Sequence, residues 1–257
     1  MTTLSIRELW IYPIKSLGGV RVAEAAITSA GSLELDREWI VVDSDNHKVW
    51  QGDIPRMTLV RVSLDATNLG LSMDGMSPVS IPRRHDGAPA TISVYKRLFP
   101  GIDAGDGVAA WLTAALGQKL RLVRVGDAAH RWDGLNPLHV LSDGSLTALN
   151  QALIEQGDSP VRAQNFRPNV VLGGAEPWSE EQYPTLDFGE ARIVLREPCV
   201  RCELPNISLI DASRGKQPLK LIGRLSRQRP AARPASFGTY CRAEGTALRT
   251  GMEARLA

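Results

Sequence analysis

The stretch LSIRELWIY at residues 4–12 alternates apolar and polar side chains, which is the pattern of a β-strand with one buried face. The same alternation predicts strands at WIVVD (39–43), TLVRVSL (58–64) and LGLSM (69–73). Turn-forming residues separate these segments, among them Gly18 and Gly19. We therefore predict that the first part of the chain is mostly β-structure.

Two later segments have helical spacing. In DGVAAWLTAALG (106–117) apolar residues recur on one helical face, and Gly117 is a stop signal. The segment LSDGSLTALNQALIEQG (141–157) predicts a second helix, capped by Ser142 or Asp143 and ended by Gly157. Its buried face is expected to hold Leu146, Leu149, Leu153 and Ile154. A strand, LRLVRV (120–125), is predicted between the two helices.

Short apolar runs broken by Pro and Gly follow the second helix. NVVLGG (169–174), ARIVL (191–195) and FGTYCRA (237–243) suit strands that close a barrel-like sheet. The pattern indicates a β-rich α+β fold with two helices. A domain boundary is expected near residue 118, which gives an N-terminal domain at 1–118 and a second domain at 119–257.

The composition excludes several classes of protein. Thirty basic and twenty-eight acidic residues give a net charge of +2, which is too balanced for a dedicated nucleic-acid binder. The locally basic run from Arg224 to Arg233 is interpreted as a solvated loop. No segment approaches the roughly 20 apolar residues of a membrane span, and no targeting signal is visible. Three cysteines favour a reducing compartment, so we expect a cytoplasmic protein.

The segment REPCVRCELPN (196–206) places Cys199 and Cys202 three positions apart. Four interpretations are open: half of a structural zinc site, a disulfide switch, two buried cysteines that act as small apolar residues, or one thiolate that binds a soft metal. In the last interpretation, Arg201 would favour the thiolate and bind an anionic cofactor. That interpretation requires further anion-binding groups elsewhere in the chain.

Such groups are present in three short motifs. YPIKS (12–16) offers Lys15 and Ser16 at a Gly-Gly turn, LDREW (35–39) offers Arg37, and NFRPN (165–169) offers Arg167 next to a rigid proline. Each residue alone has an ordinary structural explanation. Together they indicate an anion site.

The ordered set YPIKS, DREW, NFRPN, CVRC and FGTY resembles the MOSC-domain proteins of the molybdenum cofactor, specifically the bacterial YcbX-like proteins and the mitochondrial amidoxime reducing component. The resemblance runs from about residue 4 to residue 253. It implies a MOSC β-barrel preceded by an N-terminal MOSC-associated domain that is itself barrel-like.

The resemblance also implies roles for individual residues. Cys202 matches the catalytic cysteine that ligates molybdenum, whereas Cys199 matches a position that is not a ligand. Leu135 has no hydroxyl group, so its backbone N–H would serve the phosphate instead. Asp211 is expected to stand in for an acidic residue of the family. The implied cofactor-binding residues are Lys15, Ser16, Arg37, Leu135, Asn136, Arg167, Asn169, Val200, Arg201 and Tyr240.

The implied function is the reduction of N-hydroxylated or N-oxide compounds, which are small molecules, at a molybdenum–molybdopterin cofactor. Only Cys241 follows the cysteine pair, which is too few for an iron–sulfur cluster with about four ligands, so a separate electron-transfer protein is expected. One alternative is a carrier of the cofactor, or a protein that handles its sulfur, without reductase turnover. Another is a β-barrel module that binds a nucleotide or other anion.

Overall fold

The structure is a computed structural model, and it describes residues 3–126, 128, 136–229 and 233–256. The helices are α1 (Asp106–Leu116), α2 (Asp143–Glu155) and α3 (Leu219–Ser226). The strands are β1 (Ser5–Ile11), β2 (Val20–Val22), β3 (Glu24–Ala26), β4 (Trp39–Val42), β5 (Arg61–Leu64), β6 (Asn68–Ser72), β7 (Val79–Pro82), β8 (Pro89–Val94), β9 (Arg97–Asp103), β10 (Arg121–Arg124), β11 (Leu138–Ser142), β12 (Val170–Gly173), β13 (Thr185–Asp187), β14 (Ala191–Val200), β15 (Ser236–Gly245), β16 (Ala247–Arg249) and β17 (Arg255–Leu256).

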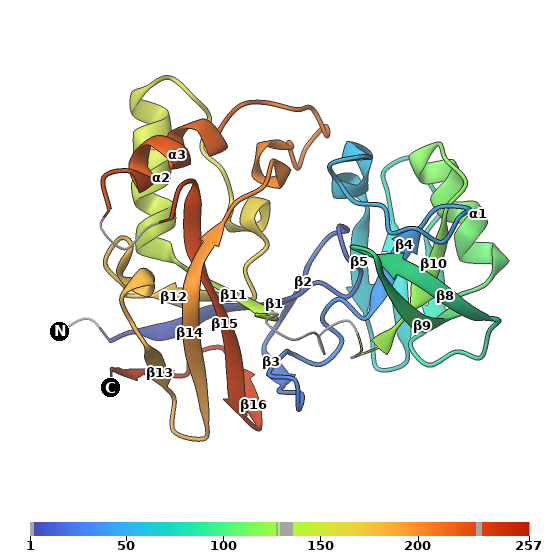
Figure 1. Cartoon of the computed structure of the whole chain (residues 1–257), viewed down its shortest axis with the longest axis horizontal. Coiled ribbons are helices and arrows are strands. Elements are labelled where there is room, and N and C mark those ends of the chain that lie inside the picture. The colour runs from blue at the N-terminus through green and yellow to red at the C-terminus, as the bar shows by residue number, and fades with distance from the viewer. Residues whose placement is uncertain (1–2, 127, 129–135, 230–232, 257) are drawn as a thin grey trace.

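The largest sheet joins the first strand of the chain to its last third. Within the described ranges its strand order is β17-β13-β14-β15-β11-β12-β1-β2. Strand β1 pairs antiparallel with β12, and Ile6 and Leu9 point into the core of this sheet. The alternation of residues 4–12 therefore reflects a β-strand with one buried face, as predicted. Figure 1 shows this sheet on one side of the molecule, with α2 and α3 beside it.

A second sheet, in the order β4-β10-β9-β8, forms the other side of the molecule. Strand β4 is buried on both faces: Trp39 and Val41 pack into a core with α1, whereas Ile40 and Val42 pack into a smaller core with β8 and β9. A four-residue run without polar interruption is the pattern expected for such a strand. Strands β5, β6 and β7 form a small antiparallel sheet that covers the α1 core.

Helix α2 begins where a capping residue was expected. The Ser142 hydroxyl oxygen accepts the backbone N–H of Ser145, which satisfies one of the free donors of the first turn. Leu149 and Leu153 are buried against α3, but Ile154 is 56% exposed, so its placement on the buried face was wrong. The reason is that Ile154 lies one residue, or about 100° of helix rotation, beyond Leu153.

The expectation of only two helices was also wrong. Leu221 and Ile222 of α3 pack with α2 and Phe237, while Lys220 and Arg224 occupy the exposed side of this amphipathic helix. The helix has only eight residues and overlaps the basic run that was interpreted as a loop. The basic run is not a solvated loop throughout, because α3 extends to Ser226 and the buried Arg229 side chain pairs with Glu181 at 3.1 Å. Residues 230–232 of that run lie outside the described residues.

Three predicted strands have different bounds. Thr58 and Leu59 belong to a 3-10 helix that begins at Pro55, so β5 starts only at Arg61. Strands β14 and β15 are longer than expected and pair along most of their length. Because β14 continues to Val200, Cys199 lies in the strand and Cys202 lies just beyond it.

None of the described helices is long and apolar enough to cross a membrane.

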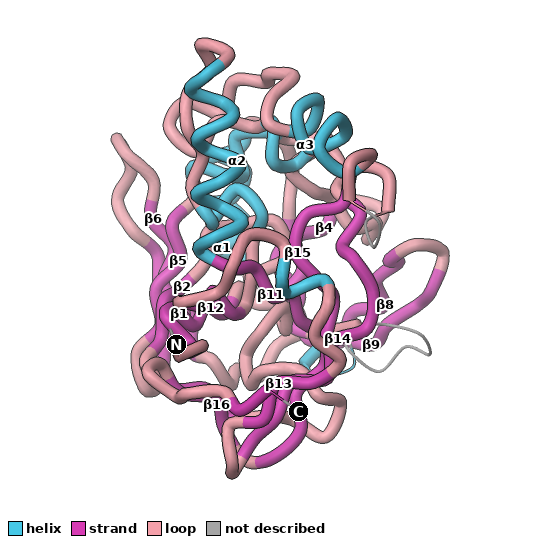
Figure 2. The backbone as a smooth tube through the Cα atoms, turned by 90° about the vertical axis from the view of Figure 1, so that its left-hand side faces the viewer, coloured by secondary structure: helices cyan, strands magenta, loops and turns pink. Residues whose placement is uncertain are grey.

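The chain passes between the two sides of the molecule more than once. Strands β1 and β2 pair within the large sheet, and β3 pairs with β16, although all three precede residue 30. The tube in Figure 2 shows β1 and β12 in one region, with both termini near the same edge. A boundary near residue 118 stays a prediction, and the first three strands pack with the C-terminal sheet.

We predict that residues 119–257 expressed alone do not fold. Without β1, strand β12 loses one of its two partners and becomes an edge strand, and the buried Ile6, Leu9 and Ile11 are missing from the core. A fragment in which residues 1–27 are linked to 119–257 restores β1 to β3 and is the matched control. Circular dichroism and cooperative thermal unfolding would separate the two. A cooperative transition of the bare fragment would contradict the prediction.

Candidate cofactor site

A cavity of about 590 Å³ is lined by residues of both sides of the molecule. It brings together nine of the predicted site residues, from segments as far apart as β4 and β15. These are Lys15, Ser16, Arg37, Asn136, Arg167, Val200, Arg201, Cys202 and Tyr240. Leu135 lies outside the described residues, and Asn169 lies behind the cavity wall rather than in it.

Lys15 and Ser16 lie where the chain leaves β1 and reaches the second sheet. The Lys15 N–H donates to the Trp39 carbonyl at 2.9 Å, next to a bridge between Ile14 and Trp39. Burial in the cavity wall, together with the positive charges of Lys48, Arg37 and Arg167, lowers the pKa of Lys15 to about 7. Because its pKa lies near neutral pH, Lys15 is expected to take up a proton when an anion binds.

Tyr12 positions two guanidinium groups. The Arg167 and Arg37 guanidinium carbons lie 4.2 and 5.0 Å from the centre of the buried Tyr12 ring. The buried Asp36 carboxylate accepts the Tyr12 N–H at 2.7 Å and pairs with Arg37. Both arginines adopt left-handed backbone conformations, with φ of 54° and 57°. The motif arginines thus share one aromatic platform and a nearby carboxylate.

Asn169 lies behind the cavity wall and hydrogen-bonds to Arg37. Its side-chain oxygen accepts hydrogen bonds from Arg37 Nη1 at 3.1 Å and from the His139 N–H at 3.2 Å, and its Nδ2 donates to the Trp10 carbonyl at 3.1 Å. These contacts give Asn169 a positioning role. A direct contact between Asn169 and a cofactor stays a prediction.

Two arginines present donors that the protein leaves unpartnered. Arg167 Nη1 donates to the Leu17 carbonyl, whereas its Nη2 is buried with no hydrogen-bond partner among the described residues. Arg201 Nε is buried and unpartnered in the same sense. Burial lowers the pKa of Arg167 to about 10, so the group remains charged at neutral pH. Unpartnered buried donors beside a cavity are the feature expected of an anion site.

The two cysteines of CVRC have different environments. Cys199 is buried, and its Sγ accepts a hydrogen bond from Arg201 Nη1 at 2.8 Å, while Arg201 Nη2 donates to the Phe166 carbonyl at 2.8 Å. Cys202 is exposed and lines the cavity. Of the two thiols, Cys202 is therefore the one that a ligand in the cavity can reach.

The structure argues against two of the interpretations of the pair. Across the described ranges no third histidine, cysteine or carboxylate joins Cys199 and Cys202 in a metal-binding group, which excludes a zinc site within those ranges. The pair lies at a strand end, with a short 3-10 turn at Leu204–Asn206 after it, and not at the start of an α-helix as in a thioredoxin-like switch.

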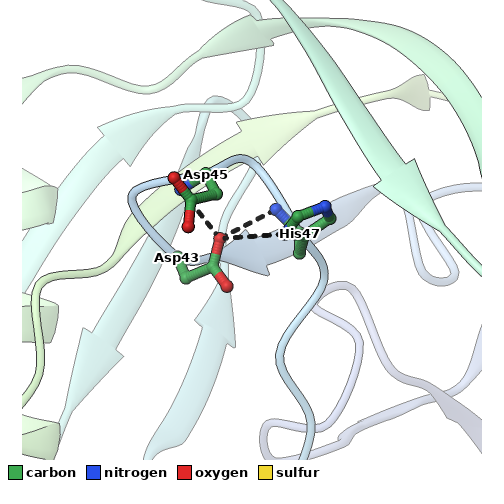
Figure 3. A group of neighbouring side chains, drawn as sticks. All are labelled: Asp43, Asp45 and His47. Atoms are coloured by element: carbon green, nitrogen blue, oxygen red, sulfur yellow. Dashed lines mark hydrogen bonds and ion pairs between the residues drawn. The ribbon is translucent and has the colours of Figure 1, made fainter.

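One other group of possible metal ligands, Asp43, Asp45 and His47, forms an exposed turn (Figure 3). Its central carboxylate already has partners, because Asp43 Oδ1 accepts the backbone N–H groups of Asp45 at 3.0 Å and His47 at 2.9 Å. This is a turn stabilised by an aspartate side chain. Asp211 also stabilises a turn, through Ser213, and it does not line the cavity, so its correspondence to an acidic residue of the family stays a prediction.

Among the residues of the cavity wall that sequence reasoning missed are Lys48, Trp50, Tyr95 and His139. His139 is buried, and its Nε2 contacts the Phe237 carbonyl at 3.1 Å, so this nitrogen donates. Burial and the nearby Arg201 and Arg37 keep the pKa of His139 well below its usual value, although the Phe237 carbonyl opposes them. Its position in the alternating segment NPLHV was the only available signal.

Comparison with known proteins agrees with this geometry. Residues 3–119 match the MOSC N-terminal beta barrel domain, and residues 111–254 match the MOSC domain. The chain belongs to the MOSC family. The family resemblance and the β-rich α+β fold class expected from the sequence are thus confirmed.

Three relatives illustrate the similarity of this MOSC chain. Mitochondrial amidoxime reducing component 2 of Rattus norvegicus is 31% identical over 250 residues, and mitochondrial amidoxime-reducing component 1 of Homo sapiens is 30% identical over 249. Each match covers 85% of the chain and 71% of the relative. Molybdenum cofactor sulfurase of Drosophila yakuba is 27% identical over 246 residues, which cover 91% of the chain but only 31% of that relative.

Gly238 in the FGTY motif leaves room for the His139 ring of this MOSC chain. It has φ of 71°, and a Cβ atom there would overlap the His139 ring and the Val140 carbonyl. We predict that Gly238→Ala lowers the free energy of unfolding by about 3 kcal/mol. Gly75→Ala is the control, because Gly75 has a similar φ of 79° in open space, and should cost about 1 kcal/mol. Equal losses in denaturant titrations would contradict the assignment.

Anion binding by the MOSC chain should depend on pH. Below pH 7 Lys15 is charged and above pH 7 it is neutral, while Arg167, with its pKa of about 10, remains charged. Sulfate keeps a constant charge and is a suitable probe. We expect its affinity to fall roughly tenfold between pH 6 and pH 9, as a charged hydrogen bond is lost. In Lys15→Met, calorimetry should show weak binding that is flat with pH. The same slope in both proteins would contradict this.

Proposed function

We propose that this chain binds a molybdenum–molybdopterin cofactor and reduces N-hydroxylated or N-oxide compounds, with Cys202 as the metal ligand. One observation carries the proposal: the accessible thiol of Cys202 shares a cavity with Lys15, Arg37 and Arg167, while Cys199 is held by Arg201. A soft thiolate beside a cationic wall suits a ligand that contains both a transition metal and a phosphate.

The residues present fit such a cofactor. The buried and unpartnered Arg167 Nη2 and Arg201 Nε are free to donate to an anion or to a polar ring. Lys15 and Ser16 add an ammonium group and a hydroxyl group at the same wall. Val200 and Asn136 line the cavity and would contact the cofactor, and the backbone contact of Leu135, which lies outside the described residues, stays a prediction.

The bound cofactor would supply two-electron redox chemistry at molybdenum, and the protein would supply binding, orientation and proton control. Lys15, Arg37 and Arg167 would hold and neutralise the phosphate. Burial and the hydrogen-bonded Cys199 raise the pKa of Tyr240, which lines the cavity next to the cysteine pair. Cys202 would tune the metal through its thiolate.

The relatives support the proposal at a coarser level. Their names include amidoxime reducing components and molybdenum cofactor sulfurases, and both point to a function related to the molybdenum cofactor. The reductase reaction is favoured because the matches to amidoxime reducing components have the higher identity and cover 71% of those relatives. We propose a cytoplasmic location, which suits three free cysteines.

Electrons would come from a separate protein. The sequence has three cysteines, and the two not assigned to the metal are buried, so an iron–sulfur cluster within this chain is not proposed. The alternative function, a carrier or sulfur-handling protein without turnover, is supported by the 27% identity to the sulfurase. A simple anion-binding module, the third hypothesis, should purify without molybdenum.

The decisive test compares the two cysteines. Cys202→Ala should lower turnover of an amidoxime by more than the 10- to 100-fold that loss of an outer partner of a metal ligand typically costs, and should lower the molybdenum content. Cys199→Ala should retain most of both. The measurement is elemental analysis with turnover assays in the presence of purified reductase and iron–sulfur proteins.

The other outcomes separate the alternatives. Equal losses in both variants would favour a redox pair or a shared metal. A full complement of molybdenum without turnover, despite competent electron supply, would favour the carrier. Turnover with NADH and this chain alone would refute the separate electron donor.

A further inference from the structure

The cavity contains a cationic and aromatic group that the five motifs do not include: Lys48, Trp50 and Tyr95. The Lys48 ammonium nitrogen lies 4.3 Å from the centre of the Tyr95 ring and 5.5 Å from the centre of a Trp50 ring. Lys15 Nζ lies 5.5 Å from the same Tyr95 ring. Two ammonium groups therefore meet at one aromatic side chain, which is itself 66% exposed.

Backbone contacts fix Lys48 and Tyr95 relative to each other. The Lys48 N–H donates to the Ser93 carbonyl at 2.9 Å, and His47 forms a β-bridge with Ser93. Tyr95 and Lys96 have φ of 50° and 65°, which is the backbone of a tight two-residue hairpin between β8 and β9. Lys48, in the loop after β4, and Tyr95, in this hairpin, are therefore held next to each other.

Trp50 connects this group to the segment after Cys202. Gly52 packs so closely on the Trp50 ring that a Cβ atom would overlap it, and the Gly52 carbonyl accepts a hydrogen bond from Arg214. Arg214 also pairs with Glu203 at 3.3 Å, next to Cys202. The aromatic wall is therefore tied to the segment that follows the predicted metal ligand.

Among the described residues, the ammonium groups of Lys48 and Lys15 form no ion pair, although Asp36 offsets part of the charge near Lys15. Asp36 itself pairs with Arg37. Lys48 is also the foremost charge among those that lower the pKa of Lys15, ahead of Arg37 and Arg167. A ligand with more than one negative group would relieve this repulsion.

We propose that Lys48, with Trp50 and Tyr95, determines substrate specificity by selecting N-oxygenated compounds that carry a planar ring and an anionic group such as a carboxylate. This rests on the proposed function, in which Lys15, Arg37 and Arg167 hold the cofactor and Lys48 is left for the substrate. The flat rings would pack against the substrate ring, and the ammonium group would pair with the anionic substituent. Cationic analogues would be repelled.

The test uses three aryl amidoximes of one scaffold: neutral, carboxylate-bearing and trimethylammonium-bearing. The molybdenum-loaded protein should favour the carboxylate through a lower KM at low salt. In Lys48→Met the ratio of kcat/KM for the carboxylate to that for the neutral compound should fall about fivefold, the effect of one partly exposed charge pair. In the same variant, kcat/KM for the cationic analogue should rise relative to that for the neutral compound. Lys48→Arg keeps the charge and should keep most of the preference.

Lys96→Met is the matched control, because Lys96 adjoins Tyr95 but does not line the cavity, and it should leave the ratios unchanged. Ratios within one variant do not depend on how much protein is active. Unchanged ratios in Lys48→Met, or an equal shift in Lys96→Met, would overturn the proposal. A loss of molybdenum in Lys48→Met would also overturn it, because Lys48 would then belong to the cofactor.

Binding without turnover separates this proposal from the proposed function. Calorimetry with the same compounds should show that the carboxylate-bearing compound binds more tightly to the wild-type protein than to the Lys48→Met variant. If no compound is reduced despite competent electron supply, but this difference persists, the subsite stands and the reductase function fails. If the compounds are reduced and the difference is absent, the specificity proposal fails alone.

Discussion

The site depends on like charges held close together in a partly dry cavity. Tyr12 supports the guanidinium groups of Arg37 and Arg167, and Asp36 offsets part of their charge. Mutual repulsion at such distances is unfavourable and grows as water is removed. The fold tolerates it because the arginines are fixed by backbone turns, by Asn169 and by the Leu17 carbonyl. Burial, together with this repulsion, lowers the pKa of Lys15, and an anionic ligand would offset the repulsion.

The cysteine pair shows how one motif yields two chemically different thiols. The difference arises from where β14 ends, because Cys199 points into the interior from the last strand residues and Cys202 follows the strand. Arg201 reinforces this by bonding to Cys199 and to Phe166. A motif that suggests a symmetrical pair thus leaves a single exposed sulfur at the cavity.

Much of the fold was predictable because its elements carry local signals. The alternation in residues 4–12 and the apolar run of β4 follow directly from burial on one face or on two. Helix α3 was not predicted because it has only eight residues and its basic side chains were interpreted as those of a solvated loop, although they lie on the exposed face of an amphipathic helix. Five motifs in a fixed order are specific enough that nine of the predicted site residues line one cavity, while their roles stay predictions. Lys48, Trp50 and Tyr95 were missed, because they meet only through the pairing of His47 with Ser93, forty-six positions later in the chain.

The two ends of the described chain lie side by side: the Ala254 N–H donates to the Leu4 carbonyl at 2.8 Å, and Ser5 bridges to Glu253. Strand β1 then leads away from this edge toward Lys15, and its seven residues span roughly 20 Å. A tag, a tether to a surface or a fused protein would therefore emerge from one point, whichever terminus carried it. Such an attachment would leave the cavity mouth unobstructed.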